Sequence, residues 1–295
     1  MKKIGVGAAI ALCLSFAPAL AADPVVETCV MSGVVGGYGI IGSASDYVET
    51  DAEGFGLFGK INFCDLFGTS INVQSGAYGE FDNAKGGFGP YDPKSDSFGY
   101  VSHYYYRSDD FAVGLLSGLG QISDDIFFGN ESEILGVVGL DAHAYLDRLT
   151  IAGQFAYWDT LTKNSEFWQI KDGYQVSGEL RYFLSDDIKL TGHVAYDKYT
   201  DESGLYPWKA FSYGAGAEYK FTDFPVSLFA DYTRIEGKVG NSTIGDNIDS
   251  DIFKGGLAIH FNNDSLISED RNGPSFATPM IDTWSNLLST SWRQN

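Results

Sequence analysis

The sequence predicts an all-β protein, a transmembrane antiparallel up-and-down β-barrel of about twelve strands with a C-terminal extension. Three observations predict this fold. Segments of about ten residues alternate between apolar and polar side chains along most of the chain, and the connections between them alternate between short and long. After the N-terminal leader, no uncharged apolar run has the roughly 18 residues that a membrane helix needs. If the chain crosses a membrane, we expect it to cross with strands.

The alternation is clearest between Tyr174 and Leu184. Even-numbered positions there are apolar, aromatic or glycine, whereas Gln175, Ser177, Glu179 and Arg181 occupy the odd positions. One face of such a strand is apolar and the other polar, as in a strand between lipid and an aqueous lumen. The same pattern predicts strands at Val30–Ile40, Gly54–Phe63, Ile71–Phe81, Phe98–Arg107, Phe111–Gln121, Ile134–Tyr145, Leu149–Trp158, Tyr174–Leu184, Ile188–Lys198, Phe211–Phe221, Val226–Tyr232 and Ile252–Phe261.

The connections provide a second, independent signal. Short polar turns are predicted at 109–110, 147–148, 185–187 and 222–225. Long polar loops are predicted between them, at 82–96, 122–133, 160–173, 199–209 and 234–251. Short turns at one end and long loops at the other are typical of membrane barrels, whereas a soluble sandwich has no reason to segregate loop lengths in this way.

Turn length also predicts the strand register, because residues directly opposite each other across a hairpin must face the same side. The turns at 109–110, 147–148 and 185–187 predict the pairs Arg107 with Ala112, His143 with Ala152, Asp141 with Gln154, Glu179 with His193, and Phe183 with Lys189.

The N-terminus has the pattern of a secretory signal peptide. Lys2 and Lys3 precede an apolar run from Ile4 to Phe16, and small residues follow up to Ala21. We therefore predict a signal peptide over 1–21, the barrel over 22–262 and the C-terminal extension over 263–295.

The charge of the chain excludes one class of partner. Acidic residues number 39 against 19 basic ones, and the formal net charge is −20. Nucleic-acid binding needs clustered Lys and Arg to contact phosphates, so we expect no nucleic-acid partner.

Over most of its length the chain resembles a Gram-negative outer-membrane β-barrel of the porin-like kind. The last predicted strand, with Phe253, Leu257, Ile259 and Phe261 on alternate positions, resembles the terminal signal that the barrel assembly machinery reads. It departs from that pattern because 262–295 follow it. The resemblance implies location in the bacterial outer membrane, with its lipid and lipopolysaccharide and the assembly machinery as partners. It leaves the oligomeric state open.

If the apolar face meets lipid, the charged positions line the lumen, because charges face hydrocarbon only at high cost. A twelve-stranded barrel has a backbone diameter of roughly 24 Å and leaves a lumen of about 10 Å. We therefore expect a passive channel for small hydrophilic solutes; a non-conducting structural or host-contact barrel is the alternative. The predicted pore-lining residues are Lys60, Glu80, Arg107, Asp141, His143, Glu179, Arg181, Lys189, His193, Asp197, Glu218, Lys220, Asp231 and Lys254.

An outer-membrane lipid-modifying enzyme is the third hypothesis. A hydrolytic site needs a serine and a histidine on one face, but the neighbours Ser102 and His103 point to opposite faces of a strand. Asp141 lies near His143 without a convincing nucleophile beside them. Zinc-type Cys and His spacing is missing from the sequence, so we expect no catalytic residues, no metal and no cofactor.

Two further expectations concern the ends of the barrel. Cys29 and Cys64 are an even pair in an exported chain and are predicted to form a disulfide, on the assumption that odd positions of the first strand face inward. Thr278 and Pro279 begin a pattern typical of an amphipathic helix. This extension could dock on the membrane face, bind a periplasmic partner, enter the barrel as a plug, or stay weakly ordered.

Overall fold

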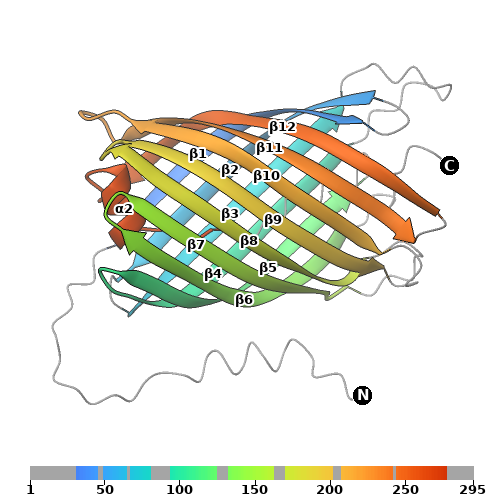
Figure 1. The fold of residues 1–295 in the computed structure, drawn as a ribbon, viewed down its shortest axis with the longest axis horizontal. Helices are drawn as coiled ribbons and strands as arrows, with labels where there is room; N and C mark the ends of the chain where they lie inside the picture. Colours follow the sequence, from blue (N-terminus) through green and yellow to red (C-terminus); the bar gives the residue numbers. More distant parts are fainter. Residues whose placement is uncertain are drawn as a thin grey trace, which may run out of the picture.

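The computed structural model is a closed antiparallel β-barrel of twelve strands (Figure 1). It describes residues 31–45, 49–64, 67–80, 94–124, 132–162, 170–201, 207–241 and 244–277. The strands are β1 (Met31–Ser45), β2 (Glu49–Phe63), β3 (Phe67–Glu80), β4 (Lys94–Arg107), β5 (Phe111–Asp124), β6 (Ser132–Leu146), β7 (Leu149–Thr160), β8 (Ile170–Ser185), β9 (Ile188–Asp201), β10 (Trp208–Lys220), β11 (Val226–Asn241) and β12 (Ile244–Phe261).

Every strand pairs with its neighbours in the sequence, and β1 pairs with β12 to close the sheet. Gly33 lies opposite Phe261 across this closure. Closure leaves no strand edge unpaired, which is the condition for a sheet to cross a bilayer. The predicted fold class is confirmed.

The register predicted from turn length is confirmed at three hairpins. Arg107 pairs with Ala112 across β4 and β5, and Asp141 pairs with Gln154 across β6 and β7. Glu179 pairs with His193 across β8 and β9. The alternation in these strands is regular enough for parity to determine which side chains face inward.

The outer surface of the barrel carries exposed apolar side chains on all sides. Leu57, Leu115, Leu180, Leu190 and Leu257 lie on five different strands and are all exposed. Because a soluble protein rarely exposes so continuous an apolar surface, this band is the lipid-facing belt of a membrane barrel. Among the described residues, no helix is long and apolar enough to span a membrane.

The loop-end connections are shorter than predicted. The range 234–251 was predicted to be a loop, but β11 continues to Asn241 and β12 begins at Ile244. Arg234, on the outer face, pairs there with Asp249 at 3.0 Å and Asp251 at 2.8 Å on the neighbouring strand. The strands extend past the lipid-facing belt. Outward positions there are charged, so the alternation of apolar and polar residues no longer indicates a strand in the sequence.

The predicted facing of the first strand is wrong. Even positions of β1 face inward: Val34 and Tyr38 are buried, whereas Val35 and Ile41 are exposed. This segment consists almost entirely of apolar residues and glycine, so its sequence does not distinguish the two faces. The register of the described residues begins with Met31 opposite Phe63. Cys29 lies outside the described residues, so its disulfide with Cys64 stays a prediction. The assumption that odd positions of the first strand face inward no longer supports it.

After β12 the chain turns back into the barrel. The helix α2 (Leu266–Asn272) lies at the short-turn end (Figure 1). Its N-cap Ser265 accepts a hydrogen bond from the backbone N–H of Ser268. The predicted signal peptide and the predicted helix after Thr278 lie outside the described residues.

Candidate functional site

The short-turn end of the lumen is occupied by residues 262–277, which we call the plug. Its first anchors are on the rim: Lys220 Nζ donates to the Asp264 carbonyl at 2.6 Å, and Arg271 donates to the Asp147 carbonyl at 2.8 Å. The backbone N–H of Ile267 donates to the Asp186 carbonyl at 3.1 Å. The turns after β6 and β8 and the side chain of Lys220 at the end of β10 thus hold the start of the plug.

Ionic contacts fix the helix α2 to the barrel wall. Arg181 Nη1 donates to Asp270 Oδ1 at 2.7 Å, and the hydroxyl of Thr150 donates to Asp270 Oδ2 at 2.5 Å. His260 Nδ1 lies 2.5 Å from Glu269 Oε2. Asp270 and Arg181 are both nearly fully buried, and charges in such a place are favourable only when they are paired.

Beyond α2 the plug enters the lumen and ends on an aromatic anchor. Phe276 is fully buried, and its ring lies 4.8 Å from that of Tyr105 and 4.7 Å from that of His143. Asn72 donates to the Phe276 carbonyl at 3.0 Å. Arg107 donates to the Gly273 carbonyl at 2.9 Å and lies over the Phe276 ring at 5.4 Å.

The side chains around Phe276 form a hydrogen-bonded network. His103 Nδ1 lies 2.8 Å from Asp141 Oδ2, and Gln154 donates to Asp141 Oδ1 at 2.6 Å. Gln154 also donates to the carbonyl of Ala277 at 2.8 Å. His103 is on β4 and Asp141 on β6, two strands apart. On the intervening strand β5, Gly114 lies opposite Asp141, and Leu116 lies opposite His103. This hydrogen-bonded network fixes the position of the plug in the lumen.

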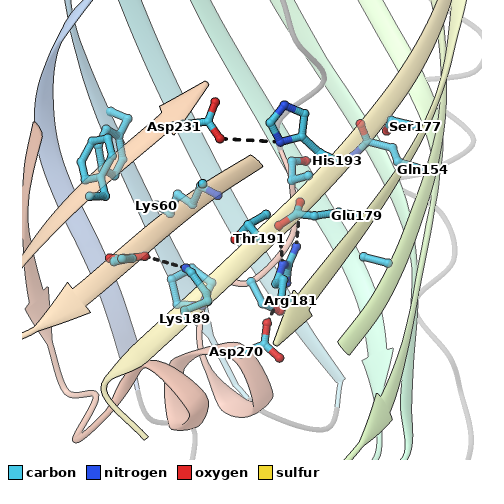
Figure 2. Close-up of a pocket in the computed structure, with 18 of the residues that line it drawn as sticks. Lys60, Gln154, Ser177, Glu179, Arg181, Lys189, Thr191, His193, Asp231 and Asp270 are labelled. Atoms are coloured by element: carbon cyan, nitrogen blue, oxygen red, sulfur yellow. Dashed lines mark hydrogen bonds and ion pairs between the residues drawn. The ribbon is translucent and has the colours of Figure 1, made fainter. Parts of the chain in front are cut away.

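Above the plug lies a cavity of about 400 Å³. Ion pairs project into it from β8 and β9 (Figure 2). Arg181 Nε donates to Glu179 at 2.7 Å, and Lys189 Nζ lies 2.6 Å from Glu218 Oε2. Positive and negative groups are mixed, so the wall has no single sign.

The inward side chains farther from the short turns are mostly apolar. Trp158 and Ile235 are essentially fully buried inside the barrel. They belong to two clusters that Trp208 joins: Val101, Leu116, Leu135, Val137, Ala156, Trp158 and Tyr199, and Tyr38, Ile40, Ala210, Ile235 and Ile252. We call these the outer apolar layer. The lumen is therefore narrowed by apolar packing on one side of the cavity and by the plug on the other.

The closed barrel resembles solved outer-membrane proteins. It is similar to an outer-membrane channel from Pseudomonas putida F1, at 10% identity and a TM-score of 0.57, over 79% of this chain and 96% of that one. The chain has the fold of a bacterial outer-membrane β-barrel. This fold and the lipid-facing belt place the barrel in the outer membrane, as the sequence predicts.

Two further structures are similar at lower scores. One is the translocator domain of the autotransporter NalP from Neisseria meningitidis, at 14% identity and a TM-score of 0.46, over 78% of this chain and 89% of that one. The other is the KdgM porin in complex with oligogalacturonate, at 14% identity and a TM-score of 0.42, over 76% and 99% of the two chains. No protein-family model matches the barrel, and neither does any curated protein.

Most of the predicted pore-lining residues border the cavity. These are Lys60, Asp141, His143, Glu179, Arg181, Lys189, His193, Glu218, Asp231 and Lys254. Three others face inward elsewhere: Arg107 and Lys220 bind the plug, and Asp197 accepts hydrogen bonds from Gln175 and Tyr199 beside the outer apolar layer. The side chain of Glu80 lies outside the described residues. A role of any of them in conduction stays a prediction.

The residues of the predicted assembly signal lie on the last strand, β12, as the sequence predicts. Phe253, Leu257 and Ile259 face outward and are exposed, and Phe261 ends the strand. Recognition by the assembly machinery stays a prediction.

Sequence reasoning missed a serine, histidine and acid arranged in a row. Ser227 Oγ lies 2.8 Å from His260 Nε2, whose Nδ1 faces Glu269. This is the order of nucleophile, base and acid in hydrolases. However, Ser227 is fully buried and its hydroxyl donates to Glu218 at 2.6 Å, so in this conformation it is neither accessible nor free to attack. The row acts here as a link between the barrel wall and α2.

Proposed function

We propose that this barrel is an outer-membrane channel for small hydrophilic solutes whose short-turn end is closed by the plug. The observation that carries the proposal is the combination of a charged cavity with a plug held chiefly by hydrogen bonds and ion pairs. Short turns are periplasmic in outer-membrane barrels, so the plug would close the periplasmic mouth.

The chemistry of the plug anchors supports a removable closure. Arg107, Asn72 and Lys220 bind carbonyl oxygens of the plug backbone. Water can replace each of these partners when the plug leaves, so undocking need not strand a buried polar group. The closed conformation also favours a second candidate, a structural barrel that never conducts.

Solute flux into liposomes separates the two candidates. We expect the full chain to admit arabinose slowly and Arg107→Ala to admit it at least several-fold faster, because that change removes two hydrogen bonds to the plug. Arg148→Ala is the matched control, since Arg148 is exposed on a short turn and pairs with Asp186 rather than with the plug. Absence of flux through the wild type and both variants, with barrels folded by circular dichroism, would favour the structural barrel.

A further inference from the structure

The cavity above the plug has two chemically different walls. On one side, Val34, Tyr38, Phe58 and Phe229 come together from β1, β2 and β11. The Phe58 ring packs against the Tyr38 ring at 6.3 Å and edge-on against the Phe229 ring at 5.8 Å. This apolar wall is a surface on which a flat or aliphatic group can lie.

The charged groups that border the cavity compensate one another. Glu179 is paired with Arg181, and Glu218 with Lys189. Asp231 Oδ2 lies 3.6 Å from His193 Nδ1. A cationic ligand would have to compete with an existing partner at each of these carboxylates.

Lys60 differs from these groups. Its Nζ donates one hydrogen bond, to the carbonyl of Phe276 at 3.3 Å. Within the described part of the chain, no carboxylate oxygen lies within ion-pair distance of this ammonium. An ammonium has three hydrogens to donate, so Lys60 retains donor capacity that faces the cavity (Figure 2).

The position of Lys60 connects it to the apolar wall. Phe58 is two residues away on the same face of β2, and Val34 lies directly opposite Lys60 on β1. The ammonium therefore lies at the foot of the apolar wall, next to the plug. A molecule with its acidic head on Lys60 would place its body against Phe58, Tyr38 and Phe229.

We propose that the cavity binds a small organic anion with an apolar body, in which a carboxylate accepts hydrogen bonds from Lys60 and the body packs on the wall formed by Tyr38, Phe58 and Phe229. This inference rests on the proposed function and names the solute class of that channel. The volume of about 400 Å³ is in the range of small-molecule sites. A charged head satisfies the ammonium more strongly than a neutral hydroxyl does.

Calorimetric titration of the full chain in detergent tests the proposal with three probes of similar shape. Benzoate, benzyl alcohol and benzylammonium share a ring and differ in the charge of the head, so partition into micelles is controlled. We expect benzoate to bind at least tenfold more tightly than the other two. Acetate, which has the head without the body, should bind at least tenfold more weakly than benzoate.

Variants assign the site. Lys60→Met should reduce benzoate affinity at least tenfold, and Lys209→Met is the control because Lys209 is exposed outside the lumen. The titrations are repeated in Arg107→Ala, where a loosened plug gives access from the short-turn end. Equal binding of benzoate and benzylammonium in both backgrounds, or unchanged benzoate binding by Lys60→Met, would overturn the proposal. Binding is measured without flux, so a failure of the channel function in liposomes is a separate result.

Discussion

An inward glycine can determine which polar side chains meet inside the barrel. Gly214 of β10 lies between His193 of β9 and Thr233 of β11 in the register, and His193 Nε2 lies 3.1 Å from the Thr233 hydroxyl across it. A Cβ at Gly214 would lie 2.0 Å from the Tyr232 carbonyl oxygen and 2.5 Å from His193 Nε2. The glycine is therefore needed for its small size at this contact.

We expect Gly214→Ala to destabilise the barrel by about 1–3 kcal/mol, the usual cost of overpacking. Gly192→Ala, on the adjacent strand, is the matched control, because a Cβ there has no neighbour within 4 Å. Urea unfolding in lipid vesicles measures the difference. Equal stability of the two variants would show that His193 and Thr233 do not need this gap.

The pKa of Asp270 determines how this residue's contribution to plug docking depends on pH. Burial raises the pKa of Asp270, but the guanidinium of Arg181 and the hydrogen bonds from Thr150 and Arg181 outweigh burial and hold this pKa below its ordinary value. Because the docked pKa is lowered, ionised Asp270 stabilises the docked state fully at pH values above the ordinary carboxylate pKa of about 3.9. This stabilisation is lost as the pH falls through the docked pKa.

The Asp270 contribution to docking should therefore be constant from pH 8 to about 5 and disappear only below about pH 4. Hydrogen exchange of the 262–277 peptide, corrected for intrinsic rates, measures docking. Asp270→Asn should raise exchange at neutral pH by an amount corresponding to about 2 kcal/mol, the size of a hydrogen bond between charged groups. Asp223→Asn on an exposed short turn should leave exchange unchanged. Unchanged exchange of the 262–277 peptide in Asp270→Asn at neutral pH would contradict the role of Asp270.

At the scale of elements, predictability followed the contrast between the two faces of a strand. In β8 polar residues alternate regularly with apolar ones, and its facing and register were predicted correctly. In β1 glycine and apolar residues occupy both faces, and the predicted facing was inverted. The outer apolar layer was missed for the same reason, since inward residues such as Trp158 and Ile235 resemble lipid-facing ones.

An introduced charge should destabilise the barrel on its outer face and be tolerated on its lumen face. Leu257→Arg places a guanidinium on the exposed outer face of β12 and should cost about 2–4 kcal/mol near the bilayer midplane. Leu190→Arg on β9 should cost a similar amount. Thr191→Arg borders the cavity and should be tolerated. Folding yield into vesicles measures each effect; equal losses on both faces would mean that the assignment of the lipid-facing belt is wrong.

The plug could be predicted only in part. Ser265 followed by an acidic residue in the first turn is a local signal for the start of α2, and sequence reasoning overlooked it. The seat of the plug has no such signal, because it depends on contacts between distant residues. Phe276, for example, receives a hydrogen bond from Lys60 on β2. From the sequence, entry into the barrel was one alternative among several for the helix after Thr278, which lies outside the described residues, and it was not predicted for 262–277.

For the whole molecule, the plug and the outer apolar layer lie on either side of the cavity inside the barrel. If the plug is a gate, the resting channel should be nearly closed, and weakening its anchor should open it. Phe276 is the most direct target, because its buried side chain contacts His103, Tyr105 and His143. Removing such a side chain typically costs about 3–5 kcal/mol of packing.

Single-channel recording in planar bilayers tests this most directly. The full chain should show rare, small openings, and Phe276→Ala should show frequent openings of larger conductance. Phe224→Ala removes an exposed phenylalanine on a short turn and should behave as the wild type. A large steady conductance of the wild type that Phe276→Ala leaves unchanged, or silence of all three proteins, would contradict a channel closed by its C-terminal plug.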